Sequence, residues 1–95
     1  MAKASSNIPD GVTATQRAML NILNGSGRWM DGTELLVHLY DYHRTTQGVT
    51  MTAASLVRRG LVKKQTVGKA VSYHISSDGA QLLAALRYTD RAAGR

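Results

Sequence analysis

The sequence predicts a small α+β domain with a core of three helices, a two-stranded β-hairpin after them, and a C-terminal helix. Apolar residues recur at helical spacing as far as Val57, alternate as in strands between Leu61 and Ile75, and return to helical spacing after Asp78. The chain has 95 residues, of which 43% are hydrophobic, so it suits one domain with a modest core.

This domain is expected to span residues 11–86. Residues 1–10 are small and polar, which predicts a flexible N-terminal tail. Residues 87–95 are polar and Ala-rich, and are expected either to extend the last helix or to form a tail. The chain has no Cys, no signal-like apolar stretch at its start and no apolar run long enough to span a bilayer, which favours a cytoplasmic protein.

The first helix is expected to begin near Thr13, because Thr13 and Gln16 have the spacing of a capping box. Its apolar positions follow helical spacing: Ala18, Met19, Ile22 and Leu23. Residues 25–27, Gly-Ser-Gly, end it, and residues 28–30 predict a short extended piece. Trp29 is expected to be a core anchor rather than a base-stacking residue.

The second helix is expected to start near Thr33, with Asp31 explained as a cap and a buried side that consists of Leu35, Leu36 and Leu39. The third is expected to start at Thr45 or Thr46 and to end at Gly60. Its apolar stripe comprises Val49, Ala53, Leu56 and Val57. The stretch between Leu39 and Val49 is longer than a tight turn, so either the second helix is extended or the connection is a loop.

The hairpin is expected from strands at residues 61–66 and 70–75, with the turn at residues 67–69. Val71, Tyr73 and Ile75 alternate onto one face of the second strand. The last helix is expected to begin after residues 76–78, Ser-Ser-Asp, with Asp78 as a cap. Its apolar side contains Ala80, Leu82, Leu83, Ala84 and Leu86.

Two stretches resemble parts of a known family. Residues 56–62, Leu-Val-Arg-Arg-Gly-Leu-Val, resemble the end of the recognition helix and the start of the wing in MarR-like and PadR-like regulators. Residues 73–79, Tyr-His-Ile-Ser-Ser-Asp-Gly, resemble the second wing strand and the start of the next helix. The resemblance covers residues 12–86 and implies a winged helix-turn-helix fold and DNA binding.

The net charge of +6 comes from one segment. Residues 44–77 contain no Asp or Glu, and their basic residues are Arg44, Arg58, Arg59, Lys63, Lys64 and Lys69. A segregated positive charge indicates a polyanionic partner, with nucleic acid ahead of an anionic membrane surface. The alternative is a solvated basic surface that only aids solubility.

The third helix and the hairpin carry the side chains expected to contact DNA. The recognition-helix candidates are Arg44, Thr46, Gln47, Thr50, Met51 and Arg58, and the wing candidates are Lys63, Lys64 and Lys69. Gln47 has the groups to pair with adenine, Thr50 or Met51 to touch a thymine methyl, and Arg58 to reach a phosphate more often than a guanine. Arg28 is a further phosphate candidate. The alternatives are an ordinary solvated helix face and lysines that protect a sheet edge.

The sequence argues against an enzyme. Its few carboxylates fall at expected helix starts and turns, and it has no Gly-rich phosphate loop. His38, His43 and His74 lack the spacing of a zinc motif, and a metal site made by His38, Asp41 and His43 is the weaker alternative. No catalytic residue, metal or cofactor is expected.

Two functions from different classes follow. The favoured one is a sequence-specific double-stranded DNA-binding protein, a small transcriptional repressor that binds a palindromic operator as a homodimer. The first helix, the fourth helix and the C-terminal tail are the expected dimer surface, with Leu82, Leu86 and Tyr88 as contacts. The alternative is a protein–protein interaction module on the same fold, acting as an adaptor or an inhibitor of a nucleic-acid enzyme.

Overall fold

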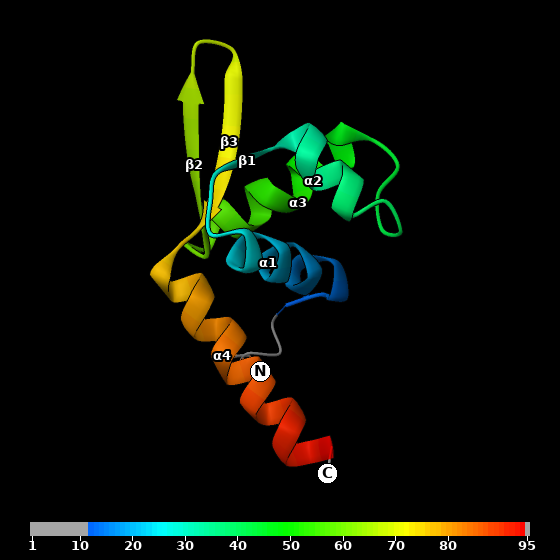
Figure 1. Cartoon of the computed structure of the whole chain (residues 1–95), viewed down its shortest axis with the longest axis vertical. Coiled ribbons are helices and arrows are strands. Elements are labelled where there is room, and N and C mark those ends of the chain that lie inside the picture. The colour runs from blue at the N-terminus through cyan, green and yellow to red at the C-terminus, as the bar shows by residue number, and fades with distance from the viewer. Residues whose placement is uncertain (1–11, 95) are drawn as a thin grey trace.

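The computed structural model describes residues 12–94, and the side chains of residues 12–88. The predicted tail at residues 1–10 therefore lies outside the described residues. The elements, in order, are α1 (Ala14–Ser26), β1 (Met30–Asp31), α2 (Gly32–His38), α3 (Thr46–Arg58), β2 (Val62–Val67), β3 (Ala70–Ile75) and α4 (Ser77–Gly94). The β2–β3 hairpin projects from one end of the helical body, and α4 projects from the other (Figure 1).

The three strands form one antiparallel sheet in the order β1-β3-β2. The predicted hairpin is confirmed, although its turn is tighter than predicted, because Val67 still pairs with Ala70. The turn is therefore made by Gly68 and Lys69, and Gly68 has a φ of 61°, a left-handed conformation that favours glycine. The short extended piece after α1 is a third strand on the other side of β3.

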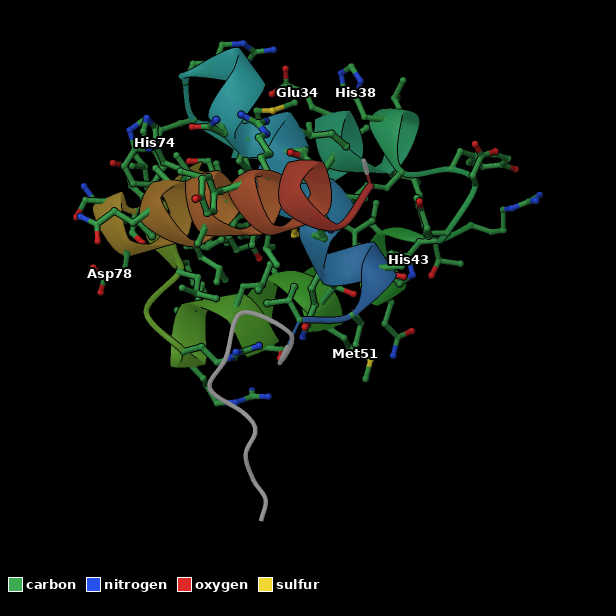
Figure 2. All side chains as sticks on the ribbon, turned by 90° about the horizontal axis from the view of Figure 1, so that it is seen from below. Glu34, His38, His43, Met51, His74 and Asp78 are labelled. Carbon is green, nitrogen blue, oxygen red and sulfur yellow. The ribbon has the colours of Figure 1, made fainter. Side chains whose placement is uncertain are left out.

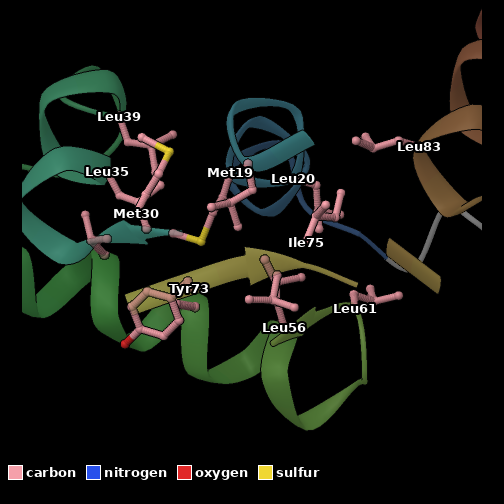
Figure 3. Close-up of a cluster of buried hydrophobic side chains, with 14 of the residues drawn as sticks. Met19, Leu20, Met30, Leu35, Leu39, Leu56, Leu61, Tyr73, Ile75 and Leu83 are labelled. Atoms are coloured by element: carbon pink, nitrogen blue, oxygen red, sulfur yellow. The ribbon is translucent and has the colours of Figure 1, made fainter. Parts of the chain in front are cut away.

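The core lies where β3 passes between α1 and α3 (Figure 3). Met19 and Leu20 of α1 reach it from one side and Leu56 of α3 from the other, and all three side chains are fully buried. The predicted α3 stripe is confirmed, with Val49, Ala53 and Leu56 buried and Val57 half-buried. Among the described residues, the opposite face of α3 is exposed and contributes nothing to the buried core.

The predicted helix starts agree with the observed caps. Thr13 and Gln16 form a reciprocal capping box at α1, and Asp31 and Glu34 form another at α2. Thr45 caps α3, since its hydroxyl accepts a hydrogen bond from the Gly48 backbone N–H at 3.2 Å. Each cap satisfies backbone N–H groups that the first helical turn leaves unpaired.

The stretch between α2 and α3 is a loop, residues 39–45, and not an extension of α2. This loop is anchored at both ends. The backbone N–H of His43 donates to the carbonyl of Leu39 at 2.8 Å, and His43 Nε2 lies 2.8 Å from the Thr52 hydroxyl of α3. A Cβ at Gly48 would come within 2.7 Å of His43 Nδ1, so the imidazole fits closely against the first turns of α3.

Two predictions about single residues were wrong. Trp29 is not a core anchor, because it is 37% exposed and its ring lies 5.2 Å from that of His74 on the surface. Its neighbour Met30 is buried in its place. The α4 helix starts at Ser77, and its cap is Ser76 rather than Asp78, because the Ser76 hydroxyl accepts from the Gly79 N–H at 3.0 Å.

Candidate nucleic-acid interface

The exposed face of α3 carries the predicted recognition residues. These are Thr46, Gln47, Thr50, Met51 and Arg58, all exposed and opposite the buried stripe. Met51 is 66% exposed, and it points out of the molecule on the side away from Glu34 and His38 (Figure 2). This face thus combines short polar side chains, one flexible apolar side chain and a late arginine, which matches the chemistry of base edges in the major groove.

Arg44 lies in the loop before α3 rather than in the helix itself. Its guanidinium lies 4.6 Å from the centroid of the Tyr40 ring, and both residues are exposed. Arg44 is therefore held at the N-terminal edge of the α3 face, at the opposite end from Arg58.

The wing candidates Lys63, Lys64 and Lys69 are all exposed. Lys63 pairs with His74 and Lys64 pairs with Tyr73, so the two neighbouring lysines lie on opposite faces of the hairpin. Tyr73 is buried, and its ring lies on the α3 side of β3 (Figure 3). Lys64 therefore shares the face that turns toward α3, and Lys63 shares the face that carries His74.

Arg28, the further phosphate candidate, is already engaged in an ion pair. Its guanidinium donates to the Glu34 carboxylate at 2.7 Å. This hydrogen bond is the main cause that lowers the pKa of Glu34 below its usual value, with a smaller effect from the Asp31 backbone N–H. Arg28 thus supports the start of α2 instead of presenting a free cation.

The loop residue Tyr40 was missed as a candidate by the sequence reasoning. It is 52% exposed and lies under the Arg44 guanidinium, whereas Tyr42, which is 51% exposed in the same loop, has no such contact with Arg44. The sequence did offer a sign, because two large aromatic residues close to Arg44 are unusual in a purely solvated connection.

The described residues contain no group of three His, Cys, Asp or Glu side chains that could hold a metal ion. His38 is exposed on α2, whereas His43 is bonded to Thr52 and His74 lies beside Trp29. Within the same residues, no helix is long and apolar enough to cross a membrane.

The predicted dimer contacts differ in their accessibility. Tyr88 is 73% exposed and Leu82 is half-buried, both on α4. Leu86 is only 8% exposed and packs in the core, so it is not free to meet a partner and this part of the prediction was wrong.

No protein-family model and no curated protein matches this sequence. Solved structures do match it. MepR, a transcription regulator of the Staphylococcus aureus multidrug efflux pump MepA, has a TM-score of 0.75 at 16% identity over 87% of this chain and 61% of its own. The S. aureus MepR–DNA complex gives a TM-score of 0.76 at 16% identity, over 90% of this chain and 69% of that one.

YusO from Bacillus subtilis has a TM-score of 0.78 at 19% identity, over 87% of this chain and 58% of its own. The chain therefore spans about six-tenths of the length of MepR and YusO. The predicted winged-helix fold is confirmed, and the resemblance to MarR-like regulators is confirmed at the level of that fold.

Proposed function

We propose that this chain is a sequence-specific double-stranded DNA-binding protein and acts as a small transcriptional repressor on a palindromic operator, without catalysis. The observation that carries the proposal is that two features coincide. The face of α3 opposite its buried stripe is exposed, and it lies within residues 44–77, in the longest stretch of the sequence without acidic residues. MepR, which shares the fold, is known in complex with DNA.

In this proposal α3 enters the major groove, which is wide enough to admit a helix. Gln47 pairs with adenine, and Thr50 or Met51 contacts a thymine methyl group. Arg44 and Arg58 contact phosphates at the two ends of the helix. Lys63, Lys64 and Lys69 neutralise backbone charge from the wing, which adds affinity without reading sequence.

Binding as a homodimer explains a palindromic operator, because each subunit contacts one half of it. A two-fold axis places two recognition helices about 34 Å apart, one DNA turn. Tyr88 and Leu82 on α4, together with α1 and the end of the chain, are the proposed dimer surface. Tyr88 is highly exposed on a helix that projects from the body, which supports this choice of surface (Figure 1).

The first test is fluorescence anisotropy of the protein with a random-sequence duplex, titrated over a range of salt concentrations. Each phosphate neutralised contributes about −0.9 to the slope of log K against log salt concentration. A slope equivalent to several phosphates supports the proposal, and selection of the operator follows. No binding at low salt contradicts it.

The wing lysines provide an internal comparison in that assay. The double variant Lys63→Ala/Lys64→Ala is expected to reduce the slope by up to about 1.8, twice the value for one phosphate. Because Lys64 shares the hairpin face of Tyr73, we expect Lys64→Ala to cause the larger part of this loss. Equal slopes for the wild type and the double variant would show that the wing is not part of the DNA interface.

The second candidate is a protein–protein interaction module, and the exposed Trp29 ring beside the half-buried His74 favours it. An exposed tryptophan is a common centre of protein interfaces. If the duplex titration shows no binding, a pull-down in which Trp29→Ala abolishes capture of a partner would support this function.

A further inference from the structure

We infer that Tyr40 is a positioning residue which holds Arg44 ready to contact a DNA phosphate, and that the loop at residues 39–45 is therefore a built part of the DNA interface. The inference rests on the proposed function. It adds Tyr40 to that interface and assigns to the loop the role of holding Arg44 in place.

The first step is that the loop is fixed to the recognition helix. His43 bonds to Thr52 of α3 at 2.8 Å, and its ring leaves no room for a Cβ at Gly48. The backbone N–H groups of Tyr42 and His43 both donate to the carbonyl of Leu39 at 2.8 Å. Because the loop is bonded to α3 in this way, Arg44 keeps its place relative to α3 when the helix meets a groove.

The second step concerns the side chain of Arg44. It is exposed, and an exposed arginine ordinarily samples many rotamers, which have to be restricted on binding. Here the guanidinium lies over the Tyr40 ring at 4.6 Å, within the range of a cation–π interaction. A ring face does not compete for the guanidinium N–H groups as a carboxylate does, so these groups stay available to phosphate oxygens.

The third step is the identity of the ligand. No acidic residue occurs between Arg44 and Ser77, and Arg44 directly precedes Thr45, the cap of α3. An ordered cation at the entry of a helix that lies in the major groove meets the phosphate backbone at the groove edge. The expected ligand is thus a duplex phosphate, with no contribution to base reading.

The test is a double-mutant cycle in the salt-dependent anisotropy assay, with the wild-type chain, Tyr40→Ala, Arg44→Ala and the double variant. Arg44→Ala is expected to weaken binding and to reduce the salt slope by about 0.9, the value for one phosphate. Tyr40→Ala is expected to weaken binding about two- to five-fold with an unchanged slope, because Arg44 keeps its charge but loses its support.

The decisive result is the coupling. In the Arg44→Ala background, Tyr40→Ala is expected to have no further effect, and Tyr40→Phe is expected to retain wild-type affinity because the ring remains. Tyr42→Ala is the matched control, since Tyr42 is equally exposed in the same loop. It is expected to bind as the wild type does, and thermal melts confirm that each variant is folded.

Two results would overturn the inference while the proposed function stands. One is wild-type duplex binding that neither Tyr40→Ala nor Arg44→Ala alters. The other is a Tyr40→Ala loss that persists in the Arg44→Ala background or is matched by Tyr42→Ala, which would indicate a general role of the loop. Absence of duplex binding by the wild-type chain would instead remove the proposed function and the inference together.

Discussion

At the scale of single residues, the ion pair between Arg28 and Glu34 ties the start of β1 to the first turn of α2. Glu34 also accepts a hydrogen bond from the Asp31 N–H at 3.2 Å, so one carboxylate serves both the ion pair and the capping box. Both contacts favour the charged form and lower its pKa below the ordinary 4.5. The stabilisation from Glu34 is therefore fully present above pH 4.5 and is lost as the pH falls through the lower, folded-state pKa.

This leads to a prediction for Arg28→Ala. The pKa of Glu34 is expected to rise part of the way back to 4.5, because the hydrogen bond from Asp31 remains. The measurement is an NMR titration of the Glu34 side-chain carboxyl carbon. Arg87→Ala is the control, since Arg87 bonds to Asn21 instead, and it should leave the titration unchanged. An unchanged pKa in Arg28→Ala would show that the ion pair does not persist in solution.

Sequence patterns predicted individual residues well wherever a local rule applies. The capping partners Thr13 and Gln16 are such a case, since the contact needs only a fixed spacing of three residues. Trp29 was wrong because β1 has only two residues, so alternation could not establish which of Trp29 and Met30 faces the core. The pairing of Arg28 with Glu34 was missed because it depends on the path of the chain between them.

At the scale of elements, the junction between the wing and α4 is held by Ser76. Its hydroxyl donates to the Gly60 carbonyl at 2.7 Å and accepts from the Gly79 N–H, and its own N–H donates to the Leu61 carbonyl at 3.1 Å. Gly79 is buried directly against this junction. A Cβ there would collide with the backbone carbonyl of Leu61 and would come within 2.9 Å of Ile75.

We therefore predict that Gly79→Ala lowers the free energy of unfolding by about 1–3 kcal/mol, the usual cost of forcing atoms into a packed site. The matched control is Gly25→Ala in α1, where nothing lies within 4 Å of the new Cβ. There the substitution is expected to stabilise the chain by about 0.5–1 kcal/mol, because alanine is the better helix former. Chemical denaturation measures both, and equal effects of the two substitutions would contradict the close packing at Gly79.

Elements were predicted from the sequence to within a few residues, because each change of hydrophobic period coincides with a cap or a glycine. The Ala70–Ile75 strand was predicted with its observed bounds. The start of α4 was placed too late, because three successive residues can each cap a helix and only the contact with Gly60 selects Ser76. The faces of Lys63 and Lys64 follow from the strand register, which had not been worked out at the sequence level.

At the scale of the whole molecule, the proposed dimer makes a specific prediction. Sedimentation should give twice the chain mass of 10.3 kDa. Tyr88→Asp should reduce this to one chain and weaken binding to a palindromic duplex, because it places a charge in the proposed interface. Val37→Asp is the control, since Val37 is 71% exposed on α2, much as Tyr88 is 73% exposed on α4. A monomeric wild-type chain would remove the palindromic operator from the proposal.

The overall arrangement could be predicted because the order of elements and the basic hairpin together select one architecture. Which residues of α4 are buried and which are exposed could not be predicted. Leu86 and Tyr88 are only two residues apart, yet the first is buried and the second is exposed, and this depends on how α4 crosses α1. A helical pattern gives an apolar side, but it does not say which part of that side the same chain covers.

The outer part of the hairpin has a consequence for how this protein can change over evolutionary time. Every residue from Lys63 to Ala70 is exposed, whereas Val62 and Ile75 at the base are buried. Substitutions toward the tip therefore remove no core contact, and apart from Gly68, whose φ of 61° favours glycine, surface changes of this kind usually alter stability little. In the proposed function, selection on the tip therefore acts through its contacts with the DNA backbone, so the affinity for DNA can change in a lineage while the fold remains intact.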